Sequence, residues 1–259
     1  MTETFLDAVS EVAREAGALA MRHWRGDFER WEKSPGNPVS EVDLAVDRLL
    51  HERLRALDPE AGWLSEETAD NAERLLLPRV WVVDPIDGTR DFVRGRRGWA
   101  ISIALVEGGR PLIGVLDAPA RDEHWSAAAG GGALRNGALI QSSGRTMLSG
   151  ARVPADIVPR IDSDLVTVDK PNSIALRMAM VAADEADLVA TLRWGFEWDI
   201  AAAALIAEEA GARVTDARGH TLRYNSTRGD AFGVLVASPG IHAAAVSRLA
   251  ERANSAFAR

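Results

Sequence analysis

The segment that most constrains this chain runs from Trp81 to Thr89, with the sequence Trp-Val-Val-Asp-Pro-Ile-Asp-Gly-Thr. Its apolar first residues are typical of a buried strand, which ends in Asp84 and Asp87 just before Gly88. Carboxylate oxygens are the ligands that hard cations such as Mg²⁺ prefer. A glycine beside them lets backbone N–H groups approach an anion. The segment therefore indicates a site that binds a metal ion next to a phosphate group. The alternative is a plain strand that ends in an Asp-Gly turn.

Two further acidic groups could join this site. Glu66 and Glu67 follow an apolar Trp-Leu-Ser run, and a solvated pair of loop residues is the alternative. Asp199 opens an alanine-rich segment that ends at Gly211, so we expect a helix there. Aspartate is common at the N-cap of a helix, and capping is therefore the alternative role for Asp199.

The bulk properties bound the class of protein. A chain of 259 residues fits one large domain or two intimate subdomains. An apolar fraction of 47% with 26% charged residues is that of a soluble globular protein, and no apolar run approaches the roughly 18 residues of a membrane span. The N-terminal residues are acidic where a signal peptide is basic, and the chain has no cysteine. We therefore expect a cytoplasmic protein with no disulfide and no membrane partner.

The formal net charge of −8 argues against a nucleic-acid polymer as partner, because such binders carry a basic footprint. It also means that the overall field does not attract an anionic substrate. Local metal charge would have to do so.

Hydrophobic periodicity predicts alternating helices and strands in both halves of the chain, which favours a layered α/β sandwich. Residues 33–41 are rich in turn formers and predict a loop, and the glycines at 130–132 predict a tight turn. The expected helices cover 4–24, a segment from Val42 to Leu57, 172–183, 199–210 and 240–254. The expected strands cover 79–84, 99–107, 112–117, 123–128, 164–168, 187–191, 213–216 and 232–237.

Three separated motifs together resemble the inositol monophosphatase superfamily. They are the acidic pair at 66–67, the run 84–89, and Trp198-Asp199 before the alanine-rich segment. The resemblance extends to 114–119, 130–137 and 209–211, so it covers nearly the whole chain. It implies the αβαβα sandwich shared with fructose-1,6-bisphosphatase. We expect an N-terminal subdomain over 1–140 with most metal ligands, a C-terminal subdomain over 141–259 that supplies Asp199 and substrate contacts, and a homodimer.

The resemblance also implies a ligand set for two or three Mg²⁺ ions. Glu66, Asp84 and the carbonyl of Ile86 would bind the first ion. Asp84, Asp87 and Asp199 would bind the second, and a third ion would lie near Glu66 through waters. Ligands that are all oxygen favour Mg²⁺ over Zn²⁺.

The same resemblance implies the catalytic residues. Backbone N–H groups of Gly88 and Thr89 would hold the phosphate. Thr89, paired with Asp43 of the second helix, would accept a proton from the attacking water bound near Glu66. A surface acid in the first helical turn is the alternative role for Asp43, and Asp47, one turn later, is the second candidate. Lys33 matches a basic residue near the third ion.

The substrate is harder to predict. Inositol phosphatases of this family carry a glutamate seven residues before the last aspartate, and here that residue is Leu192. Glu197 and the run from Ser173 to Arg177 resemble the 3′(2′),5′-bisphosphate nucleotidases, although Asn172 and Arg177 depart from their pattern. We therefore favour removal of the 3′-phosphate from 3′-phosphoadenosine 5′-phosphate, with Arg177 and Glu197 as substrate contacts.

Three alternatives stay open. The first is inositol-1-phosphate or another sugar phosphate as substrate. The second is a regulatory binding protein that retains the fold, although every expected carboxylate is present. The third concerns only the basic stretch 94–97, which is either a solvated loop or a contact for a second phosphate.

Overall fold

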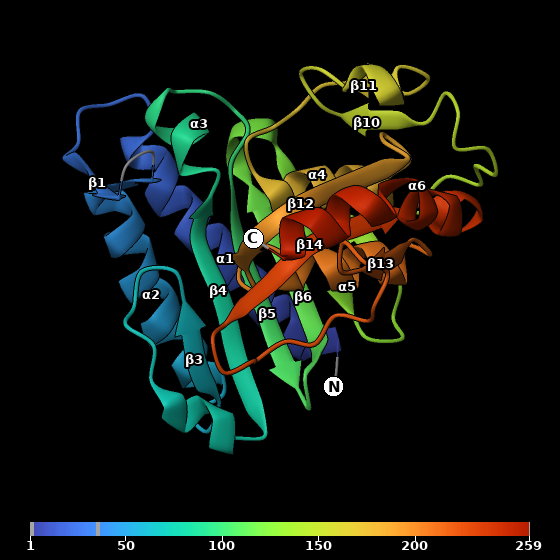
Figure 1. Cartoon of the computed structure of the whole chain (residues 1–259). Helices are drawn as coiled ribbons and strands as arrows, with labels where there is room; N and C mark the ends of the chain where they lie inside the picture. The colour runs from blue at the N-terminus through green and yellow to red at the C-terminus, as the bar shows by residue number, and fades with distance from the viewer. Residues whose placement is uncertain (1–2, 35–36, 259) are drawn as a thin grey trace.

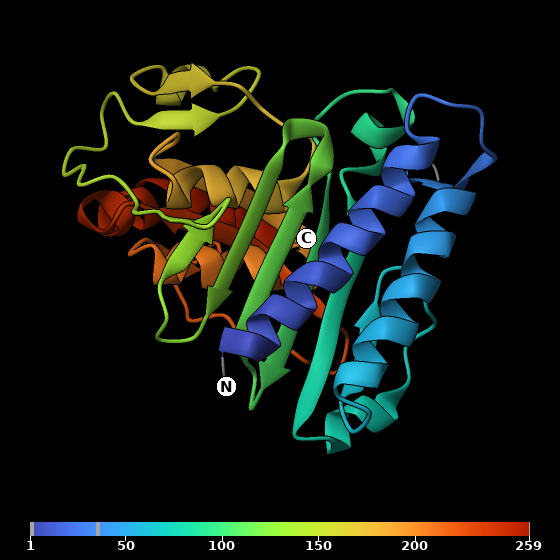
Figure 2. The ribbon, with the colours of Figure 1, turned by 180° about the vertical axis from the view of Figure 1, so that it is seen from behind.

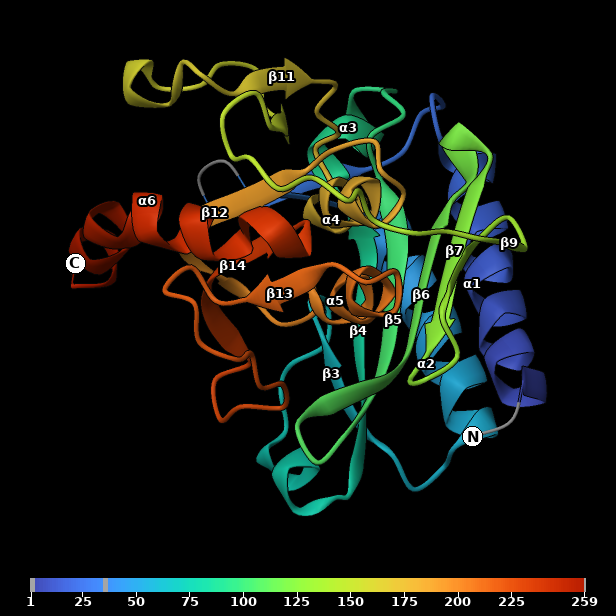
Figure 3. The same cartoon turned by 90° about the vertical axis from the view of Figure 1, so that its right-hand side faces the viewer.

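The computed structural model describes residues 3–34 and 37–258 and arranges them in five layers. Figure 3 shows them edge on: α1 and α2, a long sheet, α4 and α5, a smaller sheet, and α6. The helices are α1 (Glu3–His23), α2 (Glu41–Leu57), α3 (Thr89–Val93), α4 (Ile174–Ala182), α5 (Ala201–Glu209) and α6 (Pro239–Phe257). This arrangement is the αβαβα sandwich that the family resemblance implies.

The long sheet has the strand order β3-β4-β5-β6-β7-β8-β9, and Figure 1 shows β3 to β6 side by side. β3 and β4 are parallel and the other neighbours are antiparallel. Its strands are β3 (Gly62–Ser65), β4 (Arg79–Asp87), β5 (Ala100–Glu107), β6 (Arg110–Ala118), β7 (Glu123–Ala128), β8 (Ala133–Arg135) and β9 (Ala138–Leu139).

The continuous apolar run of β4 follows from its place between two layers of helices. Val80 and Val82 are buried in the core that faces α4 and α5. Trp81 and Val83 are buried in the core that faces α1 and α2. Because both faces of β4 are covered, the side chains from Val80 to Val83 are all apolar instead of apolar at every second position.

The two N-terminal helices lie across one face of the long sheet (Figure 2). α1 buries Val9, Val12, Ala13 and Ala16 at helical spacing against that face. On the opposite face, the small side chains of α5 allow a close approach to β6. A Cβ atom on Gly114 would lie only 2.5 Å from the carbonyl oxygen of Ala202.

The second sheet has the order β12-β14-β13 and is covered by α6. Its strands are β12 (Leu188–Phe196), β14 (Asp230–Ala237) and β13 (Arg213–Thr215). A further pair, β10 (Arg152–Pro154) and β11 (Val166–Val168), is parallel. The largest buried cluster contains residues from both sides of position 140. The proposed boundary between 1–140 and 141–259 remains a prediction.

Two turn regions test the sequence expectations. Residues 33–41 are not simply a loop, because β1 (Arg30–Ser34) pairs antiparallel with β2 (Asn37–Ser40) and α2 begins at Glu41. Residues 35–36 of that expectation lie outside the described part of the chain. The glycine turn is confirmed: the N–H groups of Gly130 and Gly132 each donate to the Glu209 carboxylate at 2.8 Å.

Within the residues that the structure describes, no helix is both long and apolar enough to cross a membrane.

Candidate active site

A polar cavity of about 540 Å³ opens where the carboxyl end of β4 meets α4 and the β12–α5 turn. Most of the predicted site residues line it, although they come from four distant parts of the sequence. They are Glu66, Asp84, Ile86, Asp87, Gly88, Thr89, Arg177 and Asp199. The cavity wall also contains seven residues that were not predicted to lie there: Pro38, Arg90, Lys170, Asn172, Ile174, Arg193 and Phe196.

The end of β4 presents Asp84 and Asp87 to this cavity. The pairing of β4 with β5 shifts in register between these two residues, which breaks the regular alternation of side chains. The backbone N–H of Ile86 donates to Asp84 Oδ1 at 3.0 Å. This bond fixes one carboxylate oxygen of Asp84 beside its own strand end.

Gly88 makes the turn from β4 into α3. Its φ is 96°, in the left-handed region that favours glycine. A Cβ atom there would lie 2.6 Å from the carbonyl oxygen of Gly98 and 2.9 Å from the N atom of Ser173. Gly88 is therefore required for the backbone to pass at this point, and the first N–H groups of α3 follow directly beside the carboxylates.

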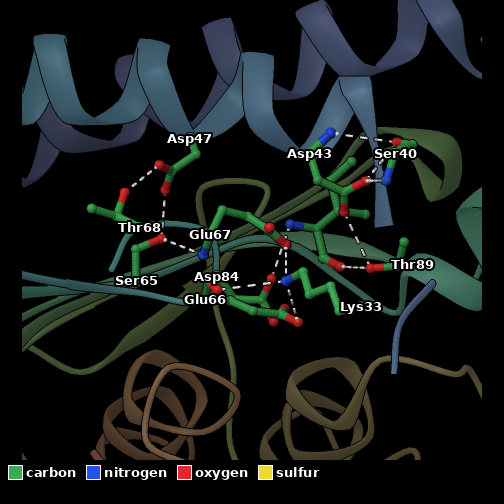
Figure 4. A network of polar contacts seen from close by, with 11 residues as sticks. Lys33, Ser40, Asp43, Asp47, Ser65, Glu66, Glu67, Thr68, Asp84 and Thr89 are labelled. Carbon is green, nitrogen blue, oxygen red and sulfur yellow. Dashed lines mark hydrogen bonds and ion pairs between the residues drawn. The ribbon is translucent and has the colours of Figure 1, made fainter. Parts of the chain in front are cut away.

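Glu66 reaches the cavity because β3 is parallel to β4. Its backbone N–H donates to the carbonyl of Val83 at 3.3 Å, one residue before Asp84. Lys33 Nζ lies 3.2 Å from Glu66 Oε1 and 2.6 Å from Glu67 Oε1 (Figure 4). Lys33 thus joins both members of the acidic pair, and Glu67 is not a solvated loop residue. Burial raises the pKa of Glu67 to about 7, although Lys33 acts against that rise.

Asp43 lies next to Thr89, as expected for the proposed proton acceptor. The Thr89 hydroxyl is 3.2 Å from Asp43 Oδ1 and 3.0 Å from the carbonyl oxygen of Ile86. Ser40, the N-cap of α2, donates to Asp43 Oδ2 from its backbone N–H at 2.8 Å and its hydroxyl at 2.5 Å. Burial raises the pKa of Asp43 to about 6, and the bonds from Ser40 and Thr89 limit the rise.

Asp47, the second candidate on α2, has different partners. Its carboxylate accepts hydrogen bonds from the hydroxyls of Ser65 at 2.5 Å and Thr68 at 2.6 Å (Figure 4). It therefore ties α2 to the segment that follows β3. In this structure Asp43, and not Asp47, contacts Thr89.

Asp87 connects the cavity to the start of α4. Its Oδ2 accepts hydrogen bonds from the Ser173 hydroxyl at 2.5 Å and the Ala175 N–H at 2.8 Å. Burial raises the pKa of Asp87 to about 6, while these bonds and the nearby Arg177 guanidinium act against the rise. Arg177 itself donates to the carbonyls of Ser173 and Asn172 at 3.3 and 3.1 Å. Asp87 is thus a support for α4 as well as a candidate metal ligand.

Asp199 is not the N-cap of α5. The helix begins at Ala201, its N-cap is Ile200, and the Ile200 carbonyl accepts a hydrogen bond from the Ala204 N–H at 2.8 Å. The carboxylate of Asp199 is left to line the cavity. Burial, with repulsion from Asp87 and Glu66, raises the pKa of Asp199 well above its ordinary range.

The four cavity carboxylates fit a hard divalent cation. Burial and repulsion from Glu66, Asp87 and Asp199 raise the pKa of Asp84 well above its ordinary range, so a bound cation would stabilise the charged form of Asp84. Among the residues described, no three acidic or histidine side chains converge tightly enough to hold an ion alone. Because Mg²⁺ retains several waters and also binds substrate phosphate, a looser set of carboxylates still suits it.

Glu197, expected to contact the substrate, and Leu192, which stands where related inositol phosphatases have a glutamate, both lie outside the cavity wall. Glu197 is fully buried and accepts hydrogen bonds from the backbone N–H groups of Asn225 at 2.5 Å and Ser226 at 2.9 Å. It holds that loop and does not line the cavity, so its surroundings do not support a substrate contact. Leu192 packs into the core under α6, as its apolar character allows, and is also absent from the cavity wall.

Arg193, next to Leu192, is the residue of β12 that reaches the cavity, together with Phe196. The pairing of β12 with β14 shifts in register between Thr191 and Trp194, and such shifts redirect side chains. A local sequence pattern does not reveal this shift. The basic segment 94–97 lines a separate neighbouring cavity of about 850 Å³, which shares only Lys170 and Asn172 with the first.

A five-layer α/β sandwich with a carboxylate-lined cavity at the end of its long sheet defines the structural class of the inositol monophosphatases and fructose-1,6-bisphosphatase. The family model for the inositol monophosphatase family matches residues 1–259. The chain therefore belongs to the inositol monophosphatase family.

Individual relatives agree with this assignment. The chain is 35% identical to a Thermotoga maritima fructose-1,6-bisphosphatase/inositol-1-monophosphatase, over 83% of this chain and 85% of the relative. It is 31% identical to the 3′(2′),5′-bisphosphate nucleotidase CysQ of Escherichia coli, over 85% and 93% of the two chains. The solved structure of a Thermotoga maritima IMPase has a TM-score of 0.82, with 30% identity over 96% and 98% of the chains. The predicted fold is thereby confirmed.

Proposed function

We propose that this protein is a Mg²⁺-dependent phosphomonoesterase that removes the 3′-phosphate of 3′-phosphoadenosine 5′-phosphate. The observation that carries the phosphatase part is the meeting of four carboxylates with the Gly88 turn and the Thr89–Asp43 pair at one cavity. Membership in a family whose matched relatives include named phosphatases supports it.

Each group has a role that its position allows. Glu66, Asp84, the Ile86 carbonyl, Asp87 and Asp199 would hold two or three Mg²⁺ ions. Bound divalent ions of this kind stabilise charge on the attacking and leaving oxygens of a phosphate ester. The N–H groups of Gly88 and Thr89 bind the phosphate oxygens.

The Thr89–Asp43 pair orients and deprotonates the attacking water. The Thr89 oxygen accepts a proton from the water as its own proton passes to Asp43 Oδ1, 3.2 Å away. Ser40 holds the Asp43 carboxylate in place through two hydrogen bonds to the other oxygen. Such a base contributes typically about 10²–10⁴-fold to a rate.

The choice of a bisphosphate rests on the cations of the cavity wall. Arg177 and Arg193 both line it, and burial together with the positive charge of Arg193 lowers the pKa of Arg177. A second phosphate on the substrate would pair with these positive charges. Leu192 supplies no acceptor for an inositol hydroxyl, and a relative named as a bisphosphate nucleotidase is consistent with this choice.

Inositol-1-phosphate is the second candidate substrate, because another matched relative is named as an inositol-1-monophosphatase. A panel of phosphate esters assayed for phosphate release with Mg²⁺ separates the two. We expect 3′-phosphoadenosine 5′-phosphate to exceed inositol-1-phosphate in kcat/KM by at least about 10-fold, or roughly 1.4 kcal/mol.

Other results of the panel would change the proposal. Equal values of kcat/KM, or a preference for inositol-1-phosphate, would contradict the nucleotide substrate and leave the phosphatase part standing. Failure to release phosphate from any ester would contradict the enzyme and favour the regulatory binding role. The expected homodimer is a separate prediction, which light scattering on the purified protein would test.

A further inference from the structure

An aromatic side chain lies in the wall of an otherwise charged cavity. Phe196, the last residue of β12, is 47% exposed and lines the cavity together with Arg193 and Asp199. Exposure of an apolar phenyl ring to water is unfavourable, and contact with another apolar group removes that surface from water. Its position beside charged groups that would bind a substrate makes it a candidate contact for an apolar part of that substrate.

A second aromatic residue packs against one face of the Phe196 ring. It stacks on Trp198 with ring centroids 4.4 Å apart and an interplanar angle of 8°. Trp198 in turn packs against the core between the two sheets, and its carbonyl accepts a hydrogen bond from the Ser102 hydroxyl at 3.2 Å. Trp198 therefore covers one face of Phe196, and the exposed part of the phenyl ring is left to the cavity.

This stacked pair is rigid for two reasons. An aromatic side chain has few rotatable bonds, and the neighbouring ring restricts those that remain. A preformed flat surface loses little conformational entropy when a planar group binds to it.

We propose that Phe196, supported by Trp198, is a stacking face for the planar ring of the substrate and selects nucleotides over phosphates without such a ring. Every nucleobase has a flat π-face that stacks on aromatic side chains, whereas the puckered ring of an inositol presents hydroxyls instead. This inference rests on the proposed function, because it assumes that the cavity binds a phosphate ester.

The test compares ligands that differ in the planar ring. Equilibrium binding of adenosine 5′-monophosphate and of ribose 5-phosphate is measured by calorimetry with Mg²⁺, for the wild-type protein, Phe196→Leu and Phe196→Trp. We expect Phe196→Leu to weaken adenosine 5′-monophosphate by about 10-fold, as loss of one base stack implies. Ribose 5-phosphate should change by less than about 2-fold, because it makes no stack. Phe196→Trp, which retains a flat ring, should bind adenosine 5′-monophosphate as the wild-type protein does.

A matched control lies on the same strand. Trp194 is 46% exposed but packs against Phe232 and Phe257 and does not line the cavity. Trp194→Leu should leave both binding constants unchanged. An equal loss for the two ligands in Phe196→Leu, or unchanged binding of adenosine 5′-monophosphate, would overturn the stacking proposal.

Turnover gives a second readout that separates this proposal from the proposed function. With 3′-phosphoadenosine 5′-phosphate, Phe196→Leu should raise KM and leave kcat nearly unchanged, because the stack is equal in ground and transition states. A selective loss of nucleotide binding in a protein that hydrolyses no phosphate ester would support the stacking face and contradict the phosphatase.

Discussion

The hydroxyl of Thr89 lies 3.2 Å from Oδ1 of Asp43, although the two residues are 46 positions apart and belong to different helices. α2 brings Asp43 to this point because its N-cap, Ser40, bonds to the same carboxylate. The Gly88 turn brings Thr89 there from the other side. The contact joins the first helical layer to the end of β4, and the proposed proton transfer depends on it.

Thr89→Ala and Asp43→Asn should each lower kcat by about 10²–10⁴-fold, because each removes one member of the proposed proton-accepting pair. The Mg²⁺ concentration that gives half-maximal activity should barely change, since neither side chain is a proposed ligand. Steady-state kinetics over a Mg²⁺ series measures both quantities.

Asp47→Asn is the control for that experiment, since it lies one turn further along α2. It weakens the bonds to Ser65 and Thr68 and should cost about 1 kcal/mol in the free energy of unfolding, with kcat close to wild type. If Asp47→Asn were the damaging change and Asp43→Asn harmless, the wrong carboxylate on α2 would have been assigned.

Asp84→Asn should lower phosphate release by at least about 10³-fold, or roughly 4 kcal/mol, because the amide retains the shape of the side chain but not the charge that two metal ions would share. In EDTA the same variant should be more stable than wild type by about 1 kcal/mol, equivalent to a Tm about 2–4 °C higher. The reason is that burial and neighbouring carboxylates already disfavour the Asp84 charge. Wild-type activity at saturating Mg²⁺ would contradict the metal-site assignment.

Arg193→Gln should reduce kcat/KM for 3′-phosphoadenosine 5′-phosphate by about 10-fold or more, since a hydrogen bond to a charged group contributes about 1.5–3 kcal/mol. Hydrolysis of inositol-1-phosphate, which has no second phosphate, should change little. Arg94→Gln is the matched control, because Arg94 lines only the neighbouring cavity. A larger loss from Arg94→Gln would place the second phosphate at the 94–97 segment instead.

The Asp187 carboxylate should make the fold sensitive to acid. It is buried and accepts hydrogen bonds from the Arg152 guanidinium at 2.9 Å and the Ser143 hydroxyl at 2.7 Å. The contacts with Arg152 and Ser143 outweigh burial and hold the pKa of Asp187 below its ordinary range. Because this pKa is lower in the folded state than in the unfolded state, the stability from ionised Asp187 is present above about pH 4 and is lost as the pH falls further.

Asp187→Asn should lower the free energy of unfolding at pH 7 by about 1.5–3 kcal/mol and flatten its dependence on pH below 4. Thermal unfolding monitored by circular dichroism between pH 3 and 7 measures both effects. Parallel pH profiles for the variant and the wild-type protein would show that Asp187 does not carry this dependence.

Much of the architecture could be predicted from the sequence. The apolar run of β4 predicted a buried strand, and the helical spacing of Val9, Val12 and Ala16 indicated the side of α1 that is buried. The resemblance of the acidic motifs to a known family implied which carboxylates would share one site. The signals in β4 and α1 are local, because hydrophobic periodicity and composition are properties of a single strand or helix.

Tertiary structure alone decided which neighbouring side chains face the cavity. Asp84, Asp87 and Arg193 line it at register shifts in β4 and β12, while the partly buried Leu192 packs against the core under α6. Glu197 lies one residue before Trp198, yet its carboxylate accepts hydrogen bonds from two backbone N–H groups of a distant loop. A side chain's direction depends on strand pairing and on donors that arrive from elsewhere in the chain, and neither is encoded in the spacing of residues along one segment.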